Sequence, residues 1–427
     1  MMYRYIFPIL IGLLFVSCAG TQPKVLNSNA KSFAEEDTYI LFALRAEQIK
    51  DNKSASELFE LLYNKSEKKE YLYRSLENDL IAKRNEELIK RVDKLSLDSV
   101  YDAKLIRLKV VALFELNRLD EAIALSISLS HKTQEPNDYL LTSDIYIKRQ
   151  EYDLAVRYLE SAYAKENNEK ILDKMSIVLY VNLGKKKEAI AHLETHSRML
   201  GCSQLVCGRL IGFYSNENNI EGLLSTYLRL YELEKNPEVA KKIIQIYSYK
   251  RDYKNLIEFL ETSNSDDEVL LQLYSSTKNY AKAFPLADKL YDETYDINYL
   301  GQSAIFEYEN AKDKNSKKVL DSVVGKLEKV TKEDNQAIYL NYLGYILIDH
   351  ELDVEKGMHY IELVLKEQPN SAFYLDSKAW GYYKLGQCRQ AKELMDRIVK
   401  LEGGNDPEVL LHIKQIDKCI KTNKGKK

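Results

Sequence analysis

The stretch NDYLLTSDIYIKRQEYDLAVRYLESAYAKE, residues 137–166, contains two amphipathic segments separated by a short polar break. In the first segment, Tyr139 and Tyr146 fall on one face of a helix with 3.6 residues per turn. In the second, Ala155 and Leu159 lie four residues apart and share a face. A small residue such as Ala155 lets the second helix approach the first closely. The stretch therefore predicts a helical hairpin.

The same pattern returns along the chain. Tyr146, Tyr180 and Tyr214 are spaced 34 residues apart. The positions nine and thirteen residues after each tyrosine are also mostly apolar: Ala155, Ala189 and Leu223, then Leu159, Leu193 and Tyr227. A period of this length is typical of stacked hairpins, in which each unit buries its apolar face only against its neighbours. The three tyrosines are therefore expected to be packing positions.

Near the C-terminus the pattern resembles a named family. The residues that carry the resemblance are Leu340-x2-Leu343-Gly344-x2-Leu347, Gly357-x3-Ile361 and Pro369, continued 35 residues later by Leu375, Ala379, Tyr382, Gly386, Ala391 and Met395. They resemble the tetratricopeptide (TPR) repeat. The resemblance covers residues 37–420 and implies an all-α, right-handed superhelical solenoid that binds protein or peptide partners.

Unit boundaries follow from the repeat. Units are expected to start near Ala103, Pro136, Lys170, Gln204, Pro237, Asn264, Ala337 and Ala372. Two degenerate units are expected within 37–98, and another within 297–336, where residues 312–318 form a polar insertion. Glycine and proline are scarce, at 16 and 7 residues, and no run of alternating β-branched residues occurs, which argues against a sheet.

The N-terminus has the features of an export signal. Residues 6–16 form an apolar run of eleven, preceded by Arg4, and eleven residues are too few to span a bilayer. A small residue, Ser17, then precedes Cys18, which resembles a bacterial lipobox, although Phe15 stands where leucine is preferred. Residues 1–17 are predicted to be a lipoprotein signal peptide, and Cys18 the lipidated mature N-terminus. An ordinary cleaved signal and an uncleaved anchor are the alternatives.

Both ends of the solenoid have polar extensions. Residues 18–36 are rich in small and polar residues and are predicted to form a flexible tether. Ala19 is not aspartate, so by resemblance to the common sorting rule the anchor is expected in the outer membrane, with the solenoid facing the periplasm. Residues 421–427 contain four lysines and are predicted to be a basic tail.

Charge and motifs exclude other classes of function. The chain carries a net charge of −3 with acidic and basic residues interspersed, so no basic stripe predicts a nucleic-acid partner. No nucleophile elbow, phosphate loop, paired-carboxylate constellation or dinucleotide turn is visible. We therefore expect no enzymatic activity and no cofactor.

Four cysteines besides Cys18 would meet an oxidising space if the chain is exported. Cys388 and Cys419 are expected to lie close together at the C-terminal cap, where a disulfide would close a loop and contribute on the order of 3 kcal/mol. Unpaired buried thiols are the alternative for this pair. Cys202 and Cys207 could form a local disulfide, and no second ligand pair predicts a metal site.

The segment His192-Leu193-Glu194-Thr195-His196 invites comparison with zinc-protease helices. Two histidines four residues apart share a helix face, but the glutamate is third in the run rather than second, and no third ligand follows. Position 196 coincides with a packing position of the repeat. A structural role is therefore predicted for this segment.

The candidate binding groove follows from the TPR resemblance. In that family the second, fifth, ninth and twelfth positions of the first helix line the concave surface. These positions correspond to Phe373, Asp376, Trp380 and Tyr383 in the last full unit, and to Ile338, Asn341, Tyr345 and Ile348 in the unit before. Aromatic anchors with a few polar groups suit a peptide groove. The alternative is that Trp380 packs against the cap helix that follows Asp406.

These features together predict a lipid-anchored periplasmic scaffold that binds a peptide or protein on its concave surface, in an envelope assembly, secretion or motility complex. Two other classes stay open. One is a solute-binding or enzymatic envelope protein with a pocket inside the superhelix. The other is a cytoplasmic adaptor whose N-terminal apolar run is not a signal.

Overall fold

The computed structural model describes residues 31–96, 101–401 and 403–424. Within these ranges every regular element is a helix, which confirms the predicted all-α class. The chain divides into two compact units, unit 1 at Met1–Glu234 and unit 2 at Lys235–Lys427. The predicted signal peptide, Cys18 and most of the predicted tether lie outside the described residues.

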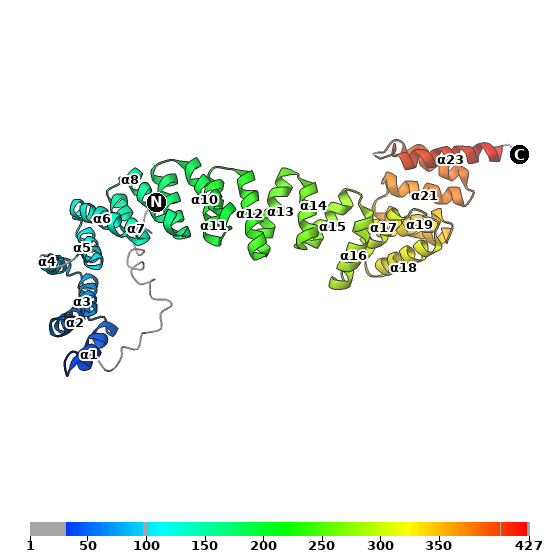
Figure 1. The fold of residues 1–427 in the computed structure, drawn as a ribbon. Coiled ribbons are helices and arrows are strands. Elements are labelled where there is room, and N and C mark those ends of the chain that lie inside the picture. Colours follow the sequence, from blue (N-terminus) through cyan, green and yellow to red (C-terminus); the bar gives the residue numbers. More distant parts are fainter. Residues whose placement is uncertain (1–30, 97–100, 402, 425–427) are drawn as a thin grey trace. The chain divides into compact units, whose positions relative to one another are not determined.

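The described part of unit 1 consists of six hairpins, each made of a first helix and a second helix, and each helix from α1 to α11 contacts the next one along the chain (Figure 1). The bounds are α1 (Glu36–Gln48), α2 (Asn52–Ser66), α3 (Lys69–Ile81), α4 (Asn85–Ser96), α5 (Ala103–Glu115), α6 (Leu119–Thr133), α7 (Pro136–Lys148), α8 (Tyr152–Glu166), α9 (Glu169–Ile177) with a π-helical continuation (Val178–Asn182), α10 (Lys186–Leu200), α11 (Gln204–Asn216) and α12 (Ile220–Glu234).

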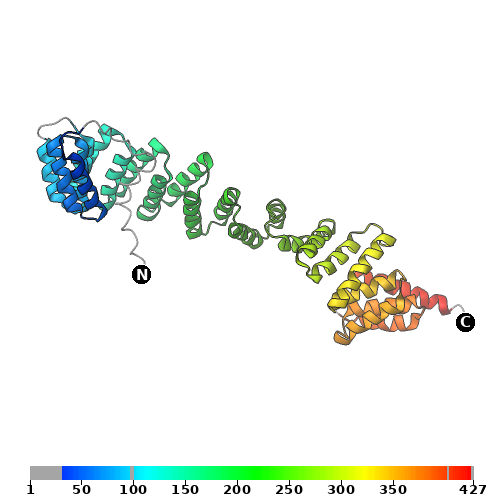
Figure 2. The same cartoon turned by 90° about the horizontal axis from the view of Figure 1, so that it is seen from below.

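Unit 2 consists, in its described part, of five further hairpins and a final helix, and its helices from α17 to α23 pack side by side (Figure 2). The bounds are α13 (Pro237–Lys250), α14 (Tyr253–Ser263), α15 (Asp267–Ser276), α16 (Tyr280–Thr294), α17 (Ile297–Asn310), α18 (Lys317–Glu333), α19 (Ala337–Asp349), α20 (Val354–Glu367), α21 (Ala372–Lys384), α22 (Cys388–Ile398) and α23 (Pro407–Lys424). Among the helices of the described ranges, none combines the length and apolar character needed to cross a bilayer.

The first helices begin where the repeat predicts, with one clear exception. Predicted starts are met by α5, α7, α11, α13, α19 and α21, and α9 begins one residue early. The unit expected at Asn264 instead begins at Asp267. Asn264 adopts a left-handed conformation (φ 49°) that ends α14, and the Asp266 carboxylate caps α15 by accepting from the Val269 N–H.

The two predicted extensions are each shortened by a helix. At the N-terminal side, α1 begins at Glu36, the last residue assigned to the tether. At the C-terminal side, α23 continues to Lys424 and so includes residues 421–424 of the predicted basic tail. A lysine near a helix C-terminus, such as Lys421, interacts favourably with the helix dipole, which supports this continuation.

The repeated tyrosines pack between helices, as the sequence predicts. Tyr146, Tyr180 and Tyr214 are all buried. Tyr180 stacks on Phe213 of the next hairpin, with ring centroids 3.9 Å apart and planes 6° from parallel. Tyr146 stacks on Tyr158 at 5.5 Å. The first contact joins neighbouring hairpins and the second joins the two helices of one hairpin, so the tyrosines belong to the core.

The expected pattern shifts by one residue in the third repeat. Ala155 and Ala189 are fully buried between the two helices of their hairpins, as expected. On α12, however, the close-packed residue is Gly222 rather than Leu223, because a Cβ on Gly222 would lie 2.5 Å from the ring of Tyr214. This places Thr226 rather than Tyr227 in the buried position that follows.

In unit 2, two glycines bring α19 and α20 into backbone contact. A Cβ on Gly344 would lie 2.9 Å from the carbonyl oxygen of Gly357, and a Cβ on Gly357 would lie 2.7 Å from that of Gly344. Both distances are shorter than any ordinary carbon–oxygen contact. These are two of the three glycines that carry the TPR resemblance, so their spacing has a direct structural reason.

Ion pairs run along one edge of unit 1. In four successive hairpins, a basic residue in the turn between the two helices reaches an acidic residue on the second helix of the hairpin before. The pairs are Arg84–Glu57 at 3.4 Å, Arg118–Glu86 at 3.4 Å, Arg149–Asp120, and Lys185–Asp153 at 2.8 Å. Exposed pairs of this kind each contribute about 0–1 kcal/mol. We call this row the turn ladder.

Candidate functional site

The predicted groove residues lie on α19 and α21, two first helices that contact each other in unit 2. The last helix, α23, also contacts α21. On α23 the side chains of Val409, His412 and Ile416 fall on one helix face and are all buried. The face of α21 that was expected to be free is thus partly covered by the chain itself.

Trp380 is covered by α23 and is only 4% exposed. Its ring stacks on His412 of α23, with centroids 4.0 Å apart, and on Tyr383 at 4.6 Å. Its Nε1–H donates to Asp349 Oδ1 at 2.8 Å. The packing alternative for Trp380 therefore describes the structure, and an exposed groove position does not.

Polar contacts hold the same helix in place. His412 Nδ1 lies 2.9 Å from Asp376 Oδ2, and both side chains are buried. The Tyr345 hydroxyl donates to Glu408 Oε1 at 2.7 Å. Burial, and next the hydrogen bond to Glu408, raise the pKa of Tyr345 far above its usual range. Asp376 and Tyr345 were predicted to meet a partner and instead bind α23.

Two further predicted groove residues are closed to solvent. Asn341 is buried, and its Oδ1 accepts no hydrogen bond from the described residues. Ile348 is fully buried in the core with Met358 and Ile361. Their helix is apolar on nearly every face, so the twelfth position of α19 points inward. These two residues are corrections to the predicted groove.

The second positions of the two helices remain exposed. Ile338 on α19 is 46% exposed, and Phe373 on α21 is 53% exposed. They occupy equivalent places in adjacent hairpins. Of the predicted groove, these two apolar side chains are the ones left largely open to solvent.

Both cysteine pairs are bonded in the structure. Cys388 at the start of α22 is joined to Cys419 on α23, with Cα atoms 6.0 Å apart. Cys202 is joined to Cys207 across the start of α11, with Cα atoms 5.4 Å apart. The first disulfide ties the covering helix to the last hairpin.

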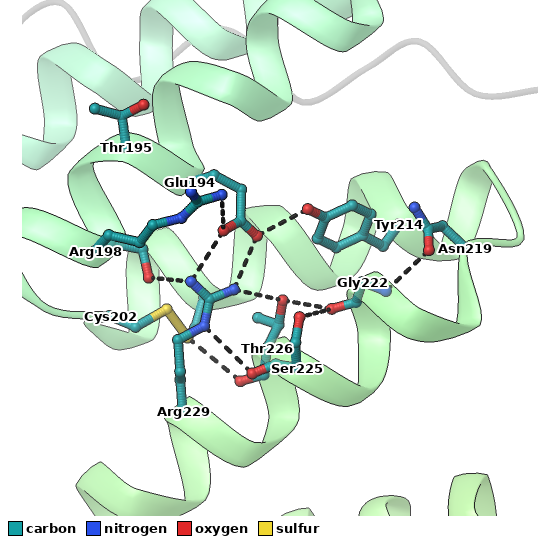
Figure 3. Close-up of polar contacts among 12 residues, drawn as sticks. Glu194, Thr195, Arg198, Cys202, Tyr214, Asn219, Gly222, Ser225, Thr226 and Arg229 are labelled. Atoms are coloured by element: carbon teal, nitrogen blue, oxygen red, sulfur yellow. Dashed lines mark hydrogen bonds and ion pairs between the residues drawn. A yellow bond between two sulfur atoms is a disulfide. The ribbon is translucent and has the colours of Figure 1, made fainter.

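The His192–His196 segment does not form one site. Glu194 points toward α11 and α12, where Arg229 Nη2 and the Tyr214 hydroxyl each donate to Oε1 at 2.8 Å (Figure 3). His196 is buried and pairs its Nδ1 with the Tyr163 hydroxyl at 2.6 Å. These two side chains are occupied by separate structural contacts, in agreement with the predicted structural role.

The Glu194 network shifts two pKa values. Burial alone would raise the pKa of Glu194, but hydrogen bonds from Arg229 and Tyr214 outweigh it and hold that pKa below its usual range. Burial, together with the hydrogen bond to Glu194, raises the pKa of Tyr214 to about 12. The network therefore keeps a charged carboxylate and a neutral phenol between three helices.

The first residue of the segment, His192, lies in different surroundings. His192 on α10 has its ring near the carboxylates of Glu188, one turn earlier, and of Glu160 on α8. The ligand atoms of the three side chains lie within 4.8 Å of one another. This cluster was not predicted from the sequence. The Glu188–His192 spacing of four residues was the available signal, but nothing local pointed to Glu160.

Comparisons with known proteins bear on the fold alone. No protein-family model matches the chain, and no curated protein matches it. Among solved structures, the chain is similar over 88% of its length to Naa15/Naa10 bound to HypK-THB, with 12% identity and a TM-score of 0.30, and it spans 65% of that chain.

Two further solved structures are similar at the same level. One is the APC/C hetero-tetramer Cut9-Hcn1, with 10% identity, a TM-score of 0.35, and coverage of 90% of this chain and 97% of that one. The other is a tetratricopeptide repeat protein from Parabacteroides merdae, with 15% identity, a TM-score of 0.28, and coverage of 66% and 99%. Scores of this size carry no argument about function, so the hairpin architecture rests on the helices described above.

Proposed function

We propose that the chain is a protein-interaction scaffold, held by lipid at Cys18 on the periplasmic side of a bacterial outer membrane. Its partner is a peptide or protein segment with apolar anchor residues. The observation that carries the proposal is the exposure of Ile338 and Phe373 at equivalent positions of two adjacent first helices. The proposal assigns no catalytic step to the chain.

Physical chemistry supports this role for the pair. Large apolar side chains exposed on neighbouring helices are a feature of interaction surfaces. Aromatic side chains such as Phe373 supply much of the binding energy in protein interfaces. The helices beneath pack closely through the Gly344–Gly357 contact and against α23, and a surface formed before binding loses less conformational entropy when a partner binds.

Site-specific crosslinking in the native cell tests the surface. A photoreactive amino acid replaces Ile338 or Phe373 in separate variants, and Leu352 serves as the matched control because it is 49% exposed in the same unit but lies in the turn after α19. We expect the same protein to be captured from positions 338 and 373, and not from position 352. Equal capture from all three positions would contradict the proposal.

A second variant removes the anchor residue. Phe373→Asp places a charge where an apolar contact is proposed, and capture from position 338 should then fall strongly while the helical circular dichroism is unchanged. Undiminished capture would show that Phe373 is not part of the surface.

Lipid anchoring is tested separately. Processing of the precursor should be blocked by globomycin, and labelled palmitate should enter the wild-type chain but not Cys18→Ser. Processing that continues in the presence of globomycin would contradict the lipid anchor at Cys18, but it would not contradict the proposed binding surface at Ile338 and Phe373.

A further inference from the structure

Three side chains with metal-ligating atoms meet on the surface of unit 1. Glu188 and His192 lie four residues apart on α10, and this spacing puts both on one helix face. Glu160 reaches them from α8, the second helix of the preceding hairpin. All the ligand atoms lie within 4.8 Å of one another.

Within the described residues, no basic side chain forms an ion pair with the two carboxylates of this cluster. Most acidic side chains of unit 1 lie in ion pairs, whereas Glu160 and Glu188 form none with the described residues. The basic residue whose field reaches both is Lys185, but its amine donates to Asp153 at 2.8 Å in the turn ladder. Two like charges held this close repel each other, and a shared cation would relieve that repulsion.

We propose that Glu160, Glu188 and His192 form a binding site for Zn²⁺. One imidazole nitrogen and two carboxylate oxygens are a donor set that Zn²⁺ accepts. Ligand atoms on a tetrahedral zinc lie about 3.3 Å apart, given bond lengths of about 2.0–2.1 Å. Rotation about the side-chain bonds of the two glutamates can bring the ligand atoms from within 4.8 Å of one another to this shorter distance.

Three protein ligands leave a fourth position on the ion. In zinc proteins that position holds water or an incoming ligand. The ion would also join the α7–α8 hairpin to the α9–α10 hairpin, since its ligands come from both. Because zinc would bind the folded chain and not the separated helices of the unfolded one, it should raise the midpoint of thermal unfolding of unit 1.

Calorimetric titration of the untagged protein with ZnCl₂ tests the site. We expect one equivalent of zinc to bind, and His192→Ala to weaken that binding by more than about tenfold, the size already typical of losing an outer-shell partner. His131→Ala is the matched control, because His131 is exposed on α6 of the same unit. Binding by the control variant should equal that of the wild type.

The two carboxylates are tested in the same way. Glu160→Gln and Glu188→Gln should each weaken zinc binding, and the melting temperature of each variant without metal should match the wild type, because neither carboxylate forms an ion pair within the described part of the chain. Zinc should raise the melting temperature of the wild type but not of His192→Ala. The proposal is wrong if zinc does not bind, if His192→Ala binds zinc as tightly as the wild type, or if neither glutamine variant differs from it.

Discussion

Gly357 shows how one missing methyl group sets the distance between two helices. Its backbone touches that of Gly344, and an added Cβ would lie 2.7 Å from the Gly344 carbonyl oxygen. The neighbour is backbone, so it cannot rotate away as a side chain could. The separation of α19 and α20 therefore depends on this residue.

We expect Gly357→Ala to lower the free energy of unfolding of unit 2 by about 1–3 kcal/mol, the usual cost of overpacking. Gly325→Ala on α18 is the control, because a Cβ there meets nothing within 4 Å. Relief of glycine's flexibility in a helix should make that variant more stable by about 0.5–1 kcal/mol. Urea unfolding followed by circular dichroism measures both. Equal effects at the two positions would contradict the contact.

Glu194 should make the stability of unit 1 depend on pH. Its pKa is lower in the folded chain than in the unfolded one, so its contribution is fully present above the unfolded value of about 4.5 and is lost as pH falls below it. Glu194→Gln should cost about 1–2 kcal/mol at pH 7, because Arg229 loses a charged partner. The difference from wild type should shrink toward pH 3.

Unfolding midpoints in urea at several pH values measure this dependence. Glu166→Gln is the matched control, since Glu166 is exposed at the end of α8 and forms no ion pair among the described residues. Its effect should be small and independent of pH. A Glu194→Gln penalty that stays constant from pH 7 to pH 3 would count against the network.

At the scale of single residues, periodicity predicted burial well and packing register less well. Tyr146 and Tyr180 were expected in the core because each recurs at the same step, and both are there. The shift from Leu223 to Gly222 was not foreseen, because both residues fit a helical pattern. The position of the Tyr214 ring decides between them, and that position depends on the tertiary packing rather than on the local sequence.

At the scale of elements, the turns between first and second helices repeat a left-handed residue. Gln150 (φ 64°) and Gly184 (φ 66°) occupy this place in successive hairpins, 34 residues apart. In this conformation a residue other than glycine has a steric cost of roughly 1–2 kcal/mol. Glycine avoids that cost, but it loses more conformational entropy on folding, so the net advantage of glycine is smaller.

Exchanging the two residue types should have opposite effects. Gln150→Gly should stabilise unit 1 by up to about 1 kcal/mol, and Gly184→Ala should destabilise it by about 1 kcal/mol, since a Cβ at Gly184 meets no neighbour within 4 Å and only the backbone conformation matters. Thermal unfolding measures both. Changes of the same sign would show that side-chain contacts dominate these turns.

At this scale the existence of α23 could be predicted from the sequence, but the surface that it covers could not. A cap helix after Asp406 was expected, and α23 begins at Pro407. Which face of α21 it covers could not be read from the pattern, because Phe373, Asp376 and Trp380 all suit a groove. The deciding contact, His412 with Asp376, joins residues 36 positions apart, and no local signal reports it. The Glu160, Glu188 and His192 cluster was missed for the same reason.

At the scale of the whole molecule, stability is spread along the chain. Unit 1 holds separate apolar clusters, one around Leu113 and one around Leu179, and unit 2 holds others around Val323 and Met395. Each cluster is built by neighbouring hairpins, as in other solenoids. Local changes should therefore destabilise one region more than the rest.

The two disulfides give a direct test of this local behaviour. Cys388 and Cys419 close a loop of 31 residues, and the double change Cys388→Ser with Cys419→Ser should lower the free energy of unfolding of unit 2 by about 3–4 kcal/mol. Cys202 and Cys207 are only five residues apart, so their removal should have a smaller effect, confined to unit 1.

Scanning calorimetry with limited proteolysis can assign each transition to its unit. The unfolding transitions of the wild type in reductant should match those of the variant in which all four cysteines are replaced by serine. This comparison controls for effects of the serine side chains themselves. A larger loss from the Cys202–Cys207 pair than from the Cys388–Cys419 pair would contradict the loop-length argument.

The covering helix has a consequence for how copies of the chain can meet. On the first described helix, α1, the apolar side chains of Leu41 and Phe42 are 66% and 58% exposed. At the other end, α23 occupies the surface on which another hairpin would stack. We therefore expect α23 to keep a second copy of the chain from stacking on the last hairpin, which disfavours head-to-tail growth into filaments from this end.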